Sequence, residues 1–369
     1  MASTDKTHET HDFIFTAQPA RVVFARGSLQ RLPQEVEALG ARRVLVLCTP
    51  QQRDQAQAAA DLLGALSVGV YDGAQMHVPI EGARLARDHA RAVGADCAVA
   101  IGGGSTIGLG KAIALESSLP IIAVPTTYAG SEMTPIYGIT EAGLKKTGRD
   151  ARVLPRTVLY DPDLSVGLPV GMSVTSGINA IAHAAEGLYA RDGNPVMSLM
   201  AEEGIRALAL GLRGVVRSPS DLAARGDCLY GAWLCGTVLG HVGMALHHKL
   251  CHTLGGSFNL PHAETHTIVL PHALHYNTQA APEAMRRIAR ALGSDDAATG
   301  VYDLAAELKA PLALRDIGMP ESELDRAADI ALANPYWNPR PIEAQAIREL
   351  LRNAWEGRRP ANKSNPECT

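Results

Sequence analysis

Short apolar runs without polar alternation place the strongest constraint on how this chain can fold. The runs Val44–Cys48, Cys97–Ile101 and Ile121–Val124 are hydrophobic at every position. Because successive side chains of a strand point to opposite faces, strands of this kind must be buried on both faces. Residues 51–63 and 82–93 lie between the first two runs and repeat small apolar residues three or four apart, as helices do. The first half therefore predicts an open α/β unit, in which crossover helices join parallel strands.

The pattern changes beyond Asp163, where long Ala- and Leu-rich segments with helical spacing take over. The predicted helices there are Thr175–Ala190, Met197–Leu212 and Leu222–Ala245. Pro162 interrupts regular structure just before the change. A chain of 369 residues also exceeds the size at which one hydrophobic core usually keeps growing. We therefore predict an α/β domain over residues 1–162 and an all-helical domain over residues 163–369.

Composition excludes several classes of protein. A net charge of −4 gives no electrostatic basis for binding nucleic acid. The six cysteines form no C-x-x-C pair and show no regular spacing, which argues against a zinc knuckle or a disulfide framework. Residues 1–11 contain no apolar stretch long enough for a signal peptide or a membrane span. We expect a cytoplasmic protein with neither a nucleic-acid nor a membrane partner.

A glycine-rich turn follows the second buried run. Gly102, Gly103, Gly104 and Ser105 come directly after Ile101 and precede a segment of helical character. Backbone N–H groups at a helix N-terminus attract phosphate, and the missing Cβ atoms let a pyrophosphate approach. The spacing is neither G-x-G-x-x-G nor a Walker A loop, and a glycine run can also be a simple tight turn.

Hydroxyl residues after the third buried run favour phosphate binding. Thr126, Thr127 and Ser131 follow the strand predicted at Ile121–Val124. Open α/β sheets bind ligands at the C-terminal ends of their strands, so two neighbouring loops can hold one dinucleotide. The alternative is a helix capping box at Ser131 or Thr134. We interpret residues 1–162 as a dinucleotide-binding domain.

Histidines gather in the helical half. Eight of the thirteen lie within residues 241–275. His248 and His252 are four residues apart, as are Asn179 and His183, so each pair shares one face of a helix. Imidazoles at this spacing can build a metal site. The candidate ligands are Asn179, His183, His248 and His262. Asn179 is the weak member, because a neutral amide binds a divalent ion less well than a carboxylate does.

Several segments, taken in order, resemble the iron-containing alcohol dehydrogenases over nearly the whole chain. They are Gly102–Ser105, Pro125–Thr127, Asp161–Pro162, the helix with Asn179 and His183, Gly243–Gly256 and Asn259–His262. Three variants resemble the maleylacetate reductase branch of this family: Pro125–Thr134, His247–His252 and Asn334–Pro341. The resemblance implies a Rossmann-like N-terminal domain, a helical C-terminal domain and usually a dimer. It also implies NAD(P)H-dependent reduction of maleylacetate, or substituted maleylacetates, to 3-oxoadipate in the breakdown of aromatic compounds.

Two departures from the family pattern affect the expected cofactors. In metal-bearing relatives an aspartate stands at the position of Asn179, and histidines at the positions of His183, His248 and His262 complete the ligands. With Asn179 in this place, we expect a site that works without a metal. Many relatives also carry an aspartate after the first strand that binds the adenosine ribose, whereas Thr49 stands in that region here. Since no carboxylate repels a 2′-phosphate, we expect NADH as cofactor and tolerance of NADPH.

The implied substrate is a dicarboxylate whose ketone is conjugated to a carbon–carbon double bond. Hydride addition to the alkene carbon β to the ketone pushes charge onto the ketone oxygen. We expect His248, His252 and Lys249 to stabilise that oxygen, with His252 as first choice of proton donor. Lys249 and Arg340 are candidates for binding the carboxylates. Tyr128 is expected to shape the pocket, although ordinary packing explains it equally well.

Three alternatives remain open from the sequence. One is a metal-dependent alcohol or polyol dehydrogenase in which Asn179 still helps to hold a divalent ion. Another is a lyase of the dehydroquinate synthase type, which uses the nicotinamide only transiently. A third is a nucleotide-binding protein that has kept the scaffold without the activity. Metal analysis tests the first, and net consumption of NADH tests the other two.

Overall fold

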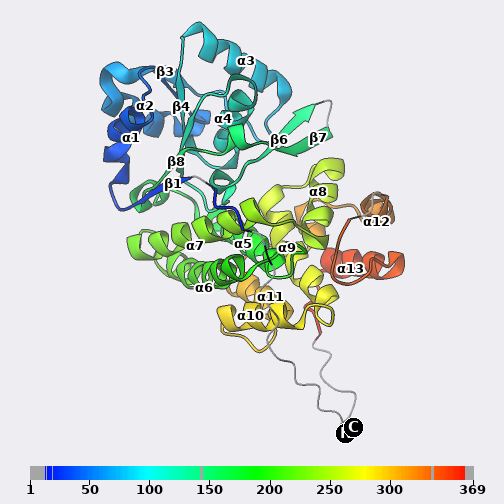
Figure 1. The fold of residues 1–369 in the computed structure, drawn as a ribbon. Helices are drawn as coiled ribbons and strands as arrows, with labels where there is room; N and C mark the ends of the chain where they lie inside the picture. Colours follow the sequence, from blue (N-terminus) through cyan, green and yellow to red (C-terminus); the bar gives the residue numbers. More distant parts are fainter. Residues whose placement is uncertain (1–12, 14, 19, 142–143, 334–335, 362–369) are drawn as a thin grey trace, which may run out of the picture.

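Six parallel strands form one sheet in the N-terminal lobe, defined here as the residues up to 162 (Figure 1). In order across the sheet they are β1 (Arg21–Phe24), β8 (Thr157–Tyr160), β5 (Ile121–Pro125), β4 (Cys97–Gly102), β2 (Val44–Leu47) and β3 (Ser67–Tyr71). The computed structural model describes residues 13, 15–18, 20–141, 144–333 and 336–361. The three buried runs of the sequence are β2, β4 and β5, which are neighbours in the sheet. The prediction of a parallel α/β sheet is therefore confirmed.

Helices cover both faces of this sheet. They are α1 (Leu32–Ala38), α2 (Arg53–Leu63), α3 (Ile80–Ala92) and α4 (Gly104–Ser117). Alternate residues of β2 take part in different cores: Val44 and Val46 pack with α1 and α2, whereas Leu45 and Leu47 pack with α3 and α4. All four side chains are fully buried. The absence of polar alternation in the central strands thus follows from burial on both faces.

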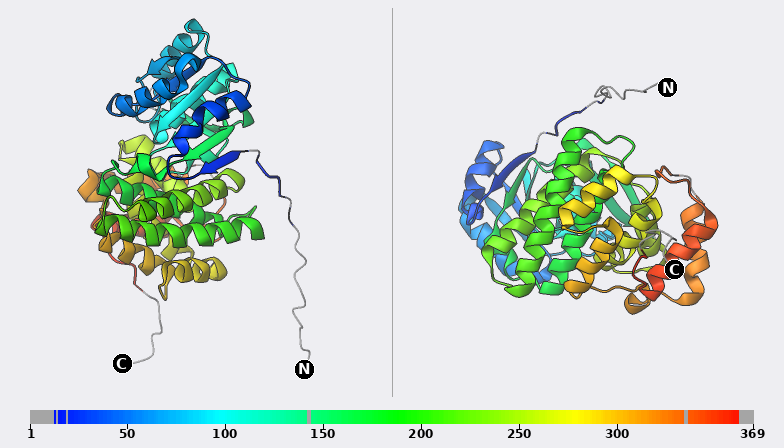
Figure 2. Two further views of the ribbon diagram at one scale, coloured as in Figure 1. Left: turned by 90° about the vertical axis from the view of Figure 1, so that its left-hand side faces the viewer. Right: turned by 90° about the horizontal axis from the view of Figure 1, so that it is seen from below.

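The C-terminal lobe, from residue 163 onward, contains only helices within its described part, as predicted. Its α-helices are α5 (Val170–Gly187), α6 (Pro195–Arg217), α7 (Leu222–His241), α8 (Leu246–Phe258), α9 (His262–Asn277), α10 (Pro282–Leu292), α11 (Ala297–Glu307), α12 (Leu324–Leu332) and α13 (Ala344–Glu356). Figure 2 shows this helical lobe packed below the sheet-containing lobe. The last strand of the sheet ends at Tyr160 and α5 begins at Val170, so the division at residue 162 stays a prediction within this connection.

The sequence prediction of one helix over Leu222–Ala245 is wrong at its end. Helix α7 ends at His241, and α8 begins at Leu246 after a bend of 96°. Val242 is extended, with φ −128° and ψ 162°. The N–H of Gly243 donates to Asp192 at 2.8 Å, which holds the turn. In the described part of the chain no single helix is long and apolar enough to cross a membrane, and α7 and α8 reach that length only as this bent pair.

The antiparallel hairpin of β6 (Ile136–Glu141) and β7 (Leu144–Arg149) was not predicted. Its strands carry Lys, Thr and Gly in place of a clear apolar alternation. The hairpin forms a separate two-stranded sheet beside the main one. It matters for function because it contributes one wall of the cavity described below.

A buried guanidinium joins segments that are distant in the sequence. Arg225 of α7 is fully buried. Its Nη1 donates to the hydroxyl of Tyr128 at 2.9 Å and to that of Ser173 at 2.8 Å. Its Nη2 and Nε donate to the carbonyl oxygens of Leu168 and Pro219, at 3.0 and 2.9 Å. A cation buried in this way depends on such acceptors, and they depend on it.

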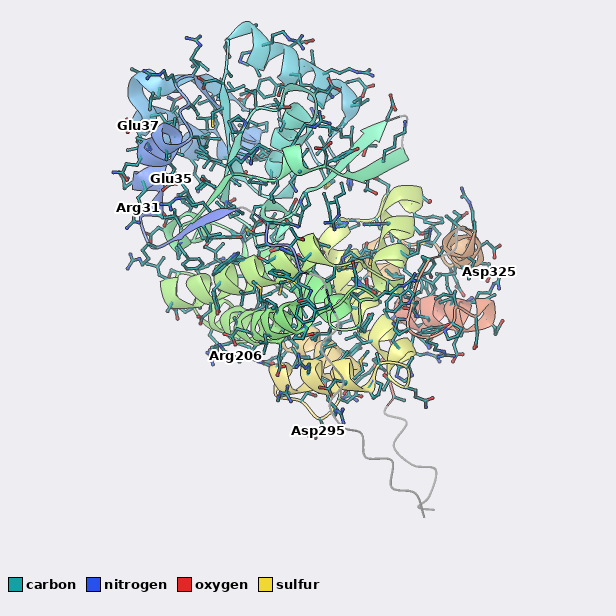
Figure 3. The ribbon with its side chains drawn as sticks, viewed as in Figure 1. Arg31, Glu35, Glu37, Arg206, Asp295 and Asp325 are labelled. Atoms are coloured by element: carbon teal, nitrogen blue, oxygen red, sulfur yellow. The ribbon has the colours of Figure 1, made fainter. Side chains whose placement is uncertain are left out.

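We predict that Arg225→Met strongly destabilises the protein. The change leaves two hydroxyls and several carbonyl oxygens buried without their donor, which should lower the free energy of unfolding by about 3 kcal/mol or more. Urea denaturation of both proteins measures the difference. The control is Arg206→Met, which removes an exposed arginine of α6 that forms a salt bridge with Glu203 at the surface (Figure 3). Equal losses in the two variants would contradict the assigned role of Arg225.

Candidate active site

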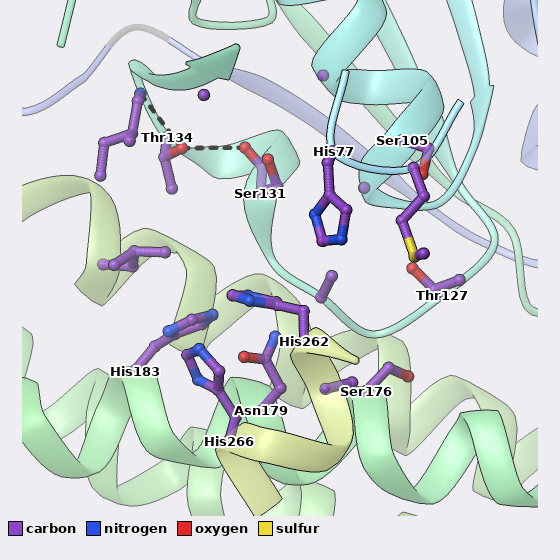
Figure 4. Close-up of a pocket in the computed structure, with 18 of the residues that line it drawn as sticks. His77, Ser105, Thr127, Ser131, Thr134, Ser176, Asn179, His183, His262 and His266 are labelled. Carbon is purple, nitrogen blue, oxygen red and sulfur yellow. Dashed lines mark hydrogen bonds between the residues drawn. The ribbon is translucent and has the colours of Figure 1, made fainter. Parts of the chain in front are cut away.

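A cavity of about 630 Å³ lies between the two lobes. The N-terminal lobe lines it with residues 76–78, the start of α4, the loop after β5 and the β6–β7 hairpin. The C-terminal lobe contributes residues of α5, α8 and α9. Figure 4 shows side chains from both lobes turned toward this space. The cavity is therefore formed by both lobes together, at the edge of the sheet that faces the helical lobe.

The glycine turn reaches this cavity at the start of α4. Gly102 has φ +150°, a conformation that favours glycine. A Cβ atom on Gly103 would lie 2.8 Å from Cγ2 of Thr127, so the turn has no room for a side chain there. Gly104 begins the helix, has open space around its Cα, and lines the cavity with Ser105. No side chain caps this helix start, so the cradle fits the phosphates of a dinucleotide.

The predicted hydroxyl residues form two groups. Thr127 and Ser131 line the cavity directly. Thr126 is buried and accepts a hydrogen bond from Nε2 of Gln52 at 2.7 Å, and Thr49 donates to Oε1 of the same glutamine at 3.2 Å. Gln52 was not singled out in the sequence, because only the fold brings the β2 and β5 loops together. The structure thus places Thr49 and Thr126 behind the glycine turn, as support for it.

Lys111 of α4 holds the loop between β5 and β6 in shape. Its ammonium group is buried and donates to the carbonyl oxygens of Ser131, Thr134 and Ile136 at 2.7, 2.9 and 2.7 Å. Burial lowers the pKa of this lysine to about 7, and the nearby carboxylate of Glu132 opposes the shift. Lys111 was not singled out in the sequence, since a lysine in a helix is usually a surface residue. In the fold it fixes the wall that carries Ser131.

The helical side of the cavity is built around a buried carboxylate. Glu186 of α5 accepts from Nδ1 of His248 at 2.7 Å and from the backbone N–H of His247 at 2.8 Å and of Ala245 at 2.9 Å. Because a carboxylate only accepts, the Nδ1 of His248 carries a proton and its Nε2 faces His183, 2.8 Å away. Glu186 therefore determines how α8 begins and how His248 is turned.

The histidines that line the cavity differ in exposure. His183, His248 and His266 are buried, and burial lowers the pKa of each well below the usual value for histidine. Neighbouring imidazoles add to the effect. His252 is one turn beyond His248 on α8 and is exposed at the cavity. It is therefore better placed than the buried imidazoles to exchange protons with water.

The four residues at the family's metal positions line one cavity. Nδ1 of His183 lies 2.8 Å from Nε2 of His248. Oδ1 of Asn179 is buried without a hydrogen-bond partner among the described residues, and its neutral amide gives these positions no carboxylate, which a divalent ion would prefer. Among the described residues, two groups have ligand atoms close enough for an ion. They are Glu186–His247–His248 and His247–Cys251–His266, which share only His248 with the family positions.

The three residues predicted to bind the substrate carboxylates or to shape the pocket, Lys249, Arg340 and Tyr128, do not line the cavity. The hydroxyl of Tyr128 is fully buried against Arg225, so this side chain supports the fold. The ammonium of Lys249 lies 5.5 Å from the ring centroid of Tyr336. The guanidinium of Arg340 stacks on Tyr276 at 4.1 Å. Helical spacing explains why Lys249 does not line the cavity: it follows His248 by one residue and so points to another face of α8. Asn334 and Pro335, part of a segment used for the resemblance, lie outside the described residues.

Family models match both halves of the chain. The model for iron-containing alcohol dehydrogenase matches residues 19–162. The model for the C-terminal part of the Fe-containing alcohol dehydrogenase family matches residues 173–355. Together the two matches leave out the termini and residues 163–172.

Characterised relatives cover almost the same length. The chain is 63% identical to the maleylacetate reductase of Burkholderia cepacia over 349 residues, which are 95% of this chain and 99% of the relative. It is 57% identical to that of Pseudomonas sp. (strain P51), with the same coverage. Among solved structures, the maleylacetate reductases of Agrobacterium tumefaciens and Rhizobium sp. strain MTP-10005 are 54% and 55% identical, each with a TM-score of 0.92. Each of these matches covers 95% of this chain and 100% of the solved one.

The geometry of the glycine turn gives a test of cofactor binding. We predict that Gly103→Ala weakens the binding of NADH by about tenfold or more, because the new methyl group overlaps Thr127 and displaces the loop that faces the phosphates. Fluorescence titration of NADH measures the dissociation constant. Gly82→Ala in α3 is the control, since a Cβ atom there meets nothing within 4 Å. An unchanged affinity in Gly103→Ala would show that the turn does not form the phosphate site.

Proposed function

The chain belongs to the iron-containing alcohol dehydrogenase family, and we propose that it is an NAD(P)H-dependent maleylacetate reductase that forms 3-oxoadipate. One observation carries this proposal: Ser105 of the glycine turn and His252 of α8 line the same cavity. A dinucleotide held at the strand ends can therefore present its reactive ring to imidazoles of the helical lobe. Relatives that bear this activity match nearly the whole chain.

Residues of the N-terminal lobe bind and orient the cofactor in this proposal. The helix start at Gly104 and Ser105 holds the pyrophosphate through backbone N–H groups. Thr127 and Ser131 add hydroxyl groups on the neighbouring loop. When bound, NAD(P)H supplies the hydride that the reduction needs. The region after β2 offers Thr49 and no carboxylate up to Gln52, which supports use of NADPH beside NADH.

Residues of the C-terminal lobe handle the charge and the proton. Negative charge develops on the ketone oxygen as the alkene is reduced, and an N–H donor aimed at that oxygen lowers the barrier. His248 is held by Glu186 and His183, so its ring is fixed in place. His252 is the exposed imidazole on the same helix face, which makes it the proton donor that we favour. Lys249 does not line the cavity, so we assign it no contact with the substrate.

We also propose that the enzyme works without a metal. The family is named for iron, so this statement rests on the residues of this chain. Asn179 places a neutral amide where metal-bearing relatives have a carboxylate, so the four family positions supply no negative charge to a divalent ion. A homodimer in the cytoplasm that acts on a small dicarboxylate completes the proposal, as family membership suggests.

The proposed reaction predicts that the enzyme consumes NADH when it is given enzymatically generated maleylacetate. The loss of absorbance at the nicotinamide band measures this consumption. His252→Ala should lower kcat on the order of a hundredfold or more, because the proton donor is removed. His275→Ala is the matched control, since this histidine belongs to the same histidine-rich segment, residues 241–275, but does not line the cavity. Equal rates for His252→Ala and the parent would remove His252 from the mechanism. Absence of NADH oxidation in the parent would remove the reaction itself.

Dialysis against a chelator tests the metal-free site. We expect the purified enzyme to keep its rate, and Asn179→Asp to bind added divalent ions more tightly than the parent, because it restores a carboxylate. Elemental analysis and activity before and after chelation are the measurements. A rate that disappears on chelation and returns with iron or zinc would favour a metal-dependent alcohol or polyol dehydrogenase instead.

A further inference from the structure

We propose that His77 binds the substrate carboxylate attached to the alkene carbon and so determines the preference for a dicarboxylate. This inference rests on the proposed function and names a residue that the sequence analysis did not consider. His77 lines the cavity from the N-terminal lobe, between Met76 and Val78. Figure 4 shows its ring descending into the cavity toward His262 and Asn179, which rise from the helical lobe.

The backbone holds His77 in an unusual conformation. His77 and Val78 have φ values of +64° and +49°, a region that residues other than glycine rarely adopt and that β-branched residues avoid. Thr140 of β6 holds both residues: its hydroxyl donates to the carbonyl oxygen of His77 at 2.8 Å, and its N–H donates to that of Val78 at 3.0 Å. The hairpin therefore fixes the backbone position from which the imidazole extends.

The same segment is packed against the helix that begins at the glycine turn. A Cβ atom on Gly108 of α4 would lie 2.7 Å from Cγ2 of Val78, so the glycine makes room for the valine. Val78 itself is buried. His77 is thus held at a fixed place relative to Gly104 and Ser105, where the cofactor phosphates are expected.

The substrate carboxylates need donors, and the two residues predicted to bind them do not supply these donors. Lys249 and Arg340 do not line the cavity, and the ammonium of Lys111 is already surrounded by oxygen atoms. Among the described cavity residues of the N-terminal lobe, His77 and Lys111 are the two that can carry a positive charge. An imidazole donates an N–H to a carboxylate in either protonation state. His77 is therefore the side chain of this lobe that suits a carboxylate.

The position of the cofactor indicates which carboxylate this is. The reacting alkene carbon must face the nicotinamide, which the N-terminal lobe holds. The ketone must face the imidazoles of α8 in the other lobe. Since one carboxylate of maleylacetate is attached to the reacting carbon, that end lies nearer to His77, and the carboxylate beyond the ketone lies nearer to the helical lobe.

Two substrate analogues, each lacking one of the two carboxylates, distinguish the two ends of the substrate in a steady-state assay. One is 4-oxopent-2-enoate, which keeps only the carboxylate on the alkene carbon, and the other is 3-oxohex-4-enoate, which keeps only the carboxylate beyond the ketone. We expect His77→Asn to lower kcat/KM by about tenfold to a hundredfold for maleylacetate and 4-oxopent-2-enoate, mainly through KM, and to leave 3-oxohex-4-enoate unaffected. Asparagine is chosen because it tolerates a positive φ.

The control is His89→Asn, the same exchange at an exposed position of α3 outside the cavity. Turnover of 3-oxohex-4-enoate shows that the variant is folded, and an unchanged dissociation constant for NADH shows that the cofactor site is intact. An equal loss with all three substrates, or no loss with maleylacetate, overturns the role of His77 while the proposed reaction stands. If the parent oxidises NADH with none of the three, the proposed reaction fails, and the role of His77 fails with it.

Discussion

The active site depends on one buried carboxylate at the C-terminal end of α5. Glu186 is completely shielded from solvent and accepts hydrogen bonds from the first turn of α8, from the ring of His248 and from the hydroxyl of Tyr189. A buried charge is tolerated only where several donors surround it, so the chain must place these donors together. The turn after α7 and the start of α8 bring these donors to Glu186. The same arrangement directs the histidines of α8 into the cavity.

Much of the fold could be predicted because the central strands are buried on both faces. Continuous apolar runs identified β2, β4 and β5, and the change to helical spacing identified the second lobe. The edge strands escaped prediction for a physical reason: β3 contains Gly69 and is half-buried along its length, so it lacks a clear pattern. The bend between α7 and α8 escaped as well. It is produced by contacts of Asp192 and Glu186 with the turn, and helical periodicity contains no information about such partners.

The parts of the candidate site that could be predicted are those in which residues close together in the sequence reach the cavity together. Glycines after a strand identified the turn that leads from β4 into α4 and reaches the cavity, and imidazoles four residues apart identified one face of α8. Neighbours in sequence were less reliable guides: Lys249 and Tyr128 adjoin cavity residues but point elsewhere. Gln52, Lys111 and His77 gain their roles only through tertiary contacts with other loops. No pattern within their own segments distinguishes them from surface residues.

The uneven exposure of the imidazoles sets a condition on the catalytic cycle. In the proposed mechanism His252 gives up one proton in each cycle, and the buried histidines behind it cannot readily replace that proton, because burial disfavours their charged forms. The replacement proton then has to come from bulk water through the mouth of the cavity. In that mechanism the cavity has to be open to solvent at some point in every cycle, and the time that this takes limits turnover.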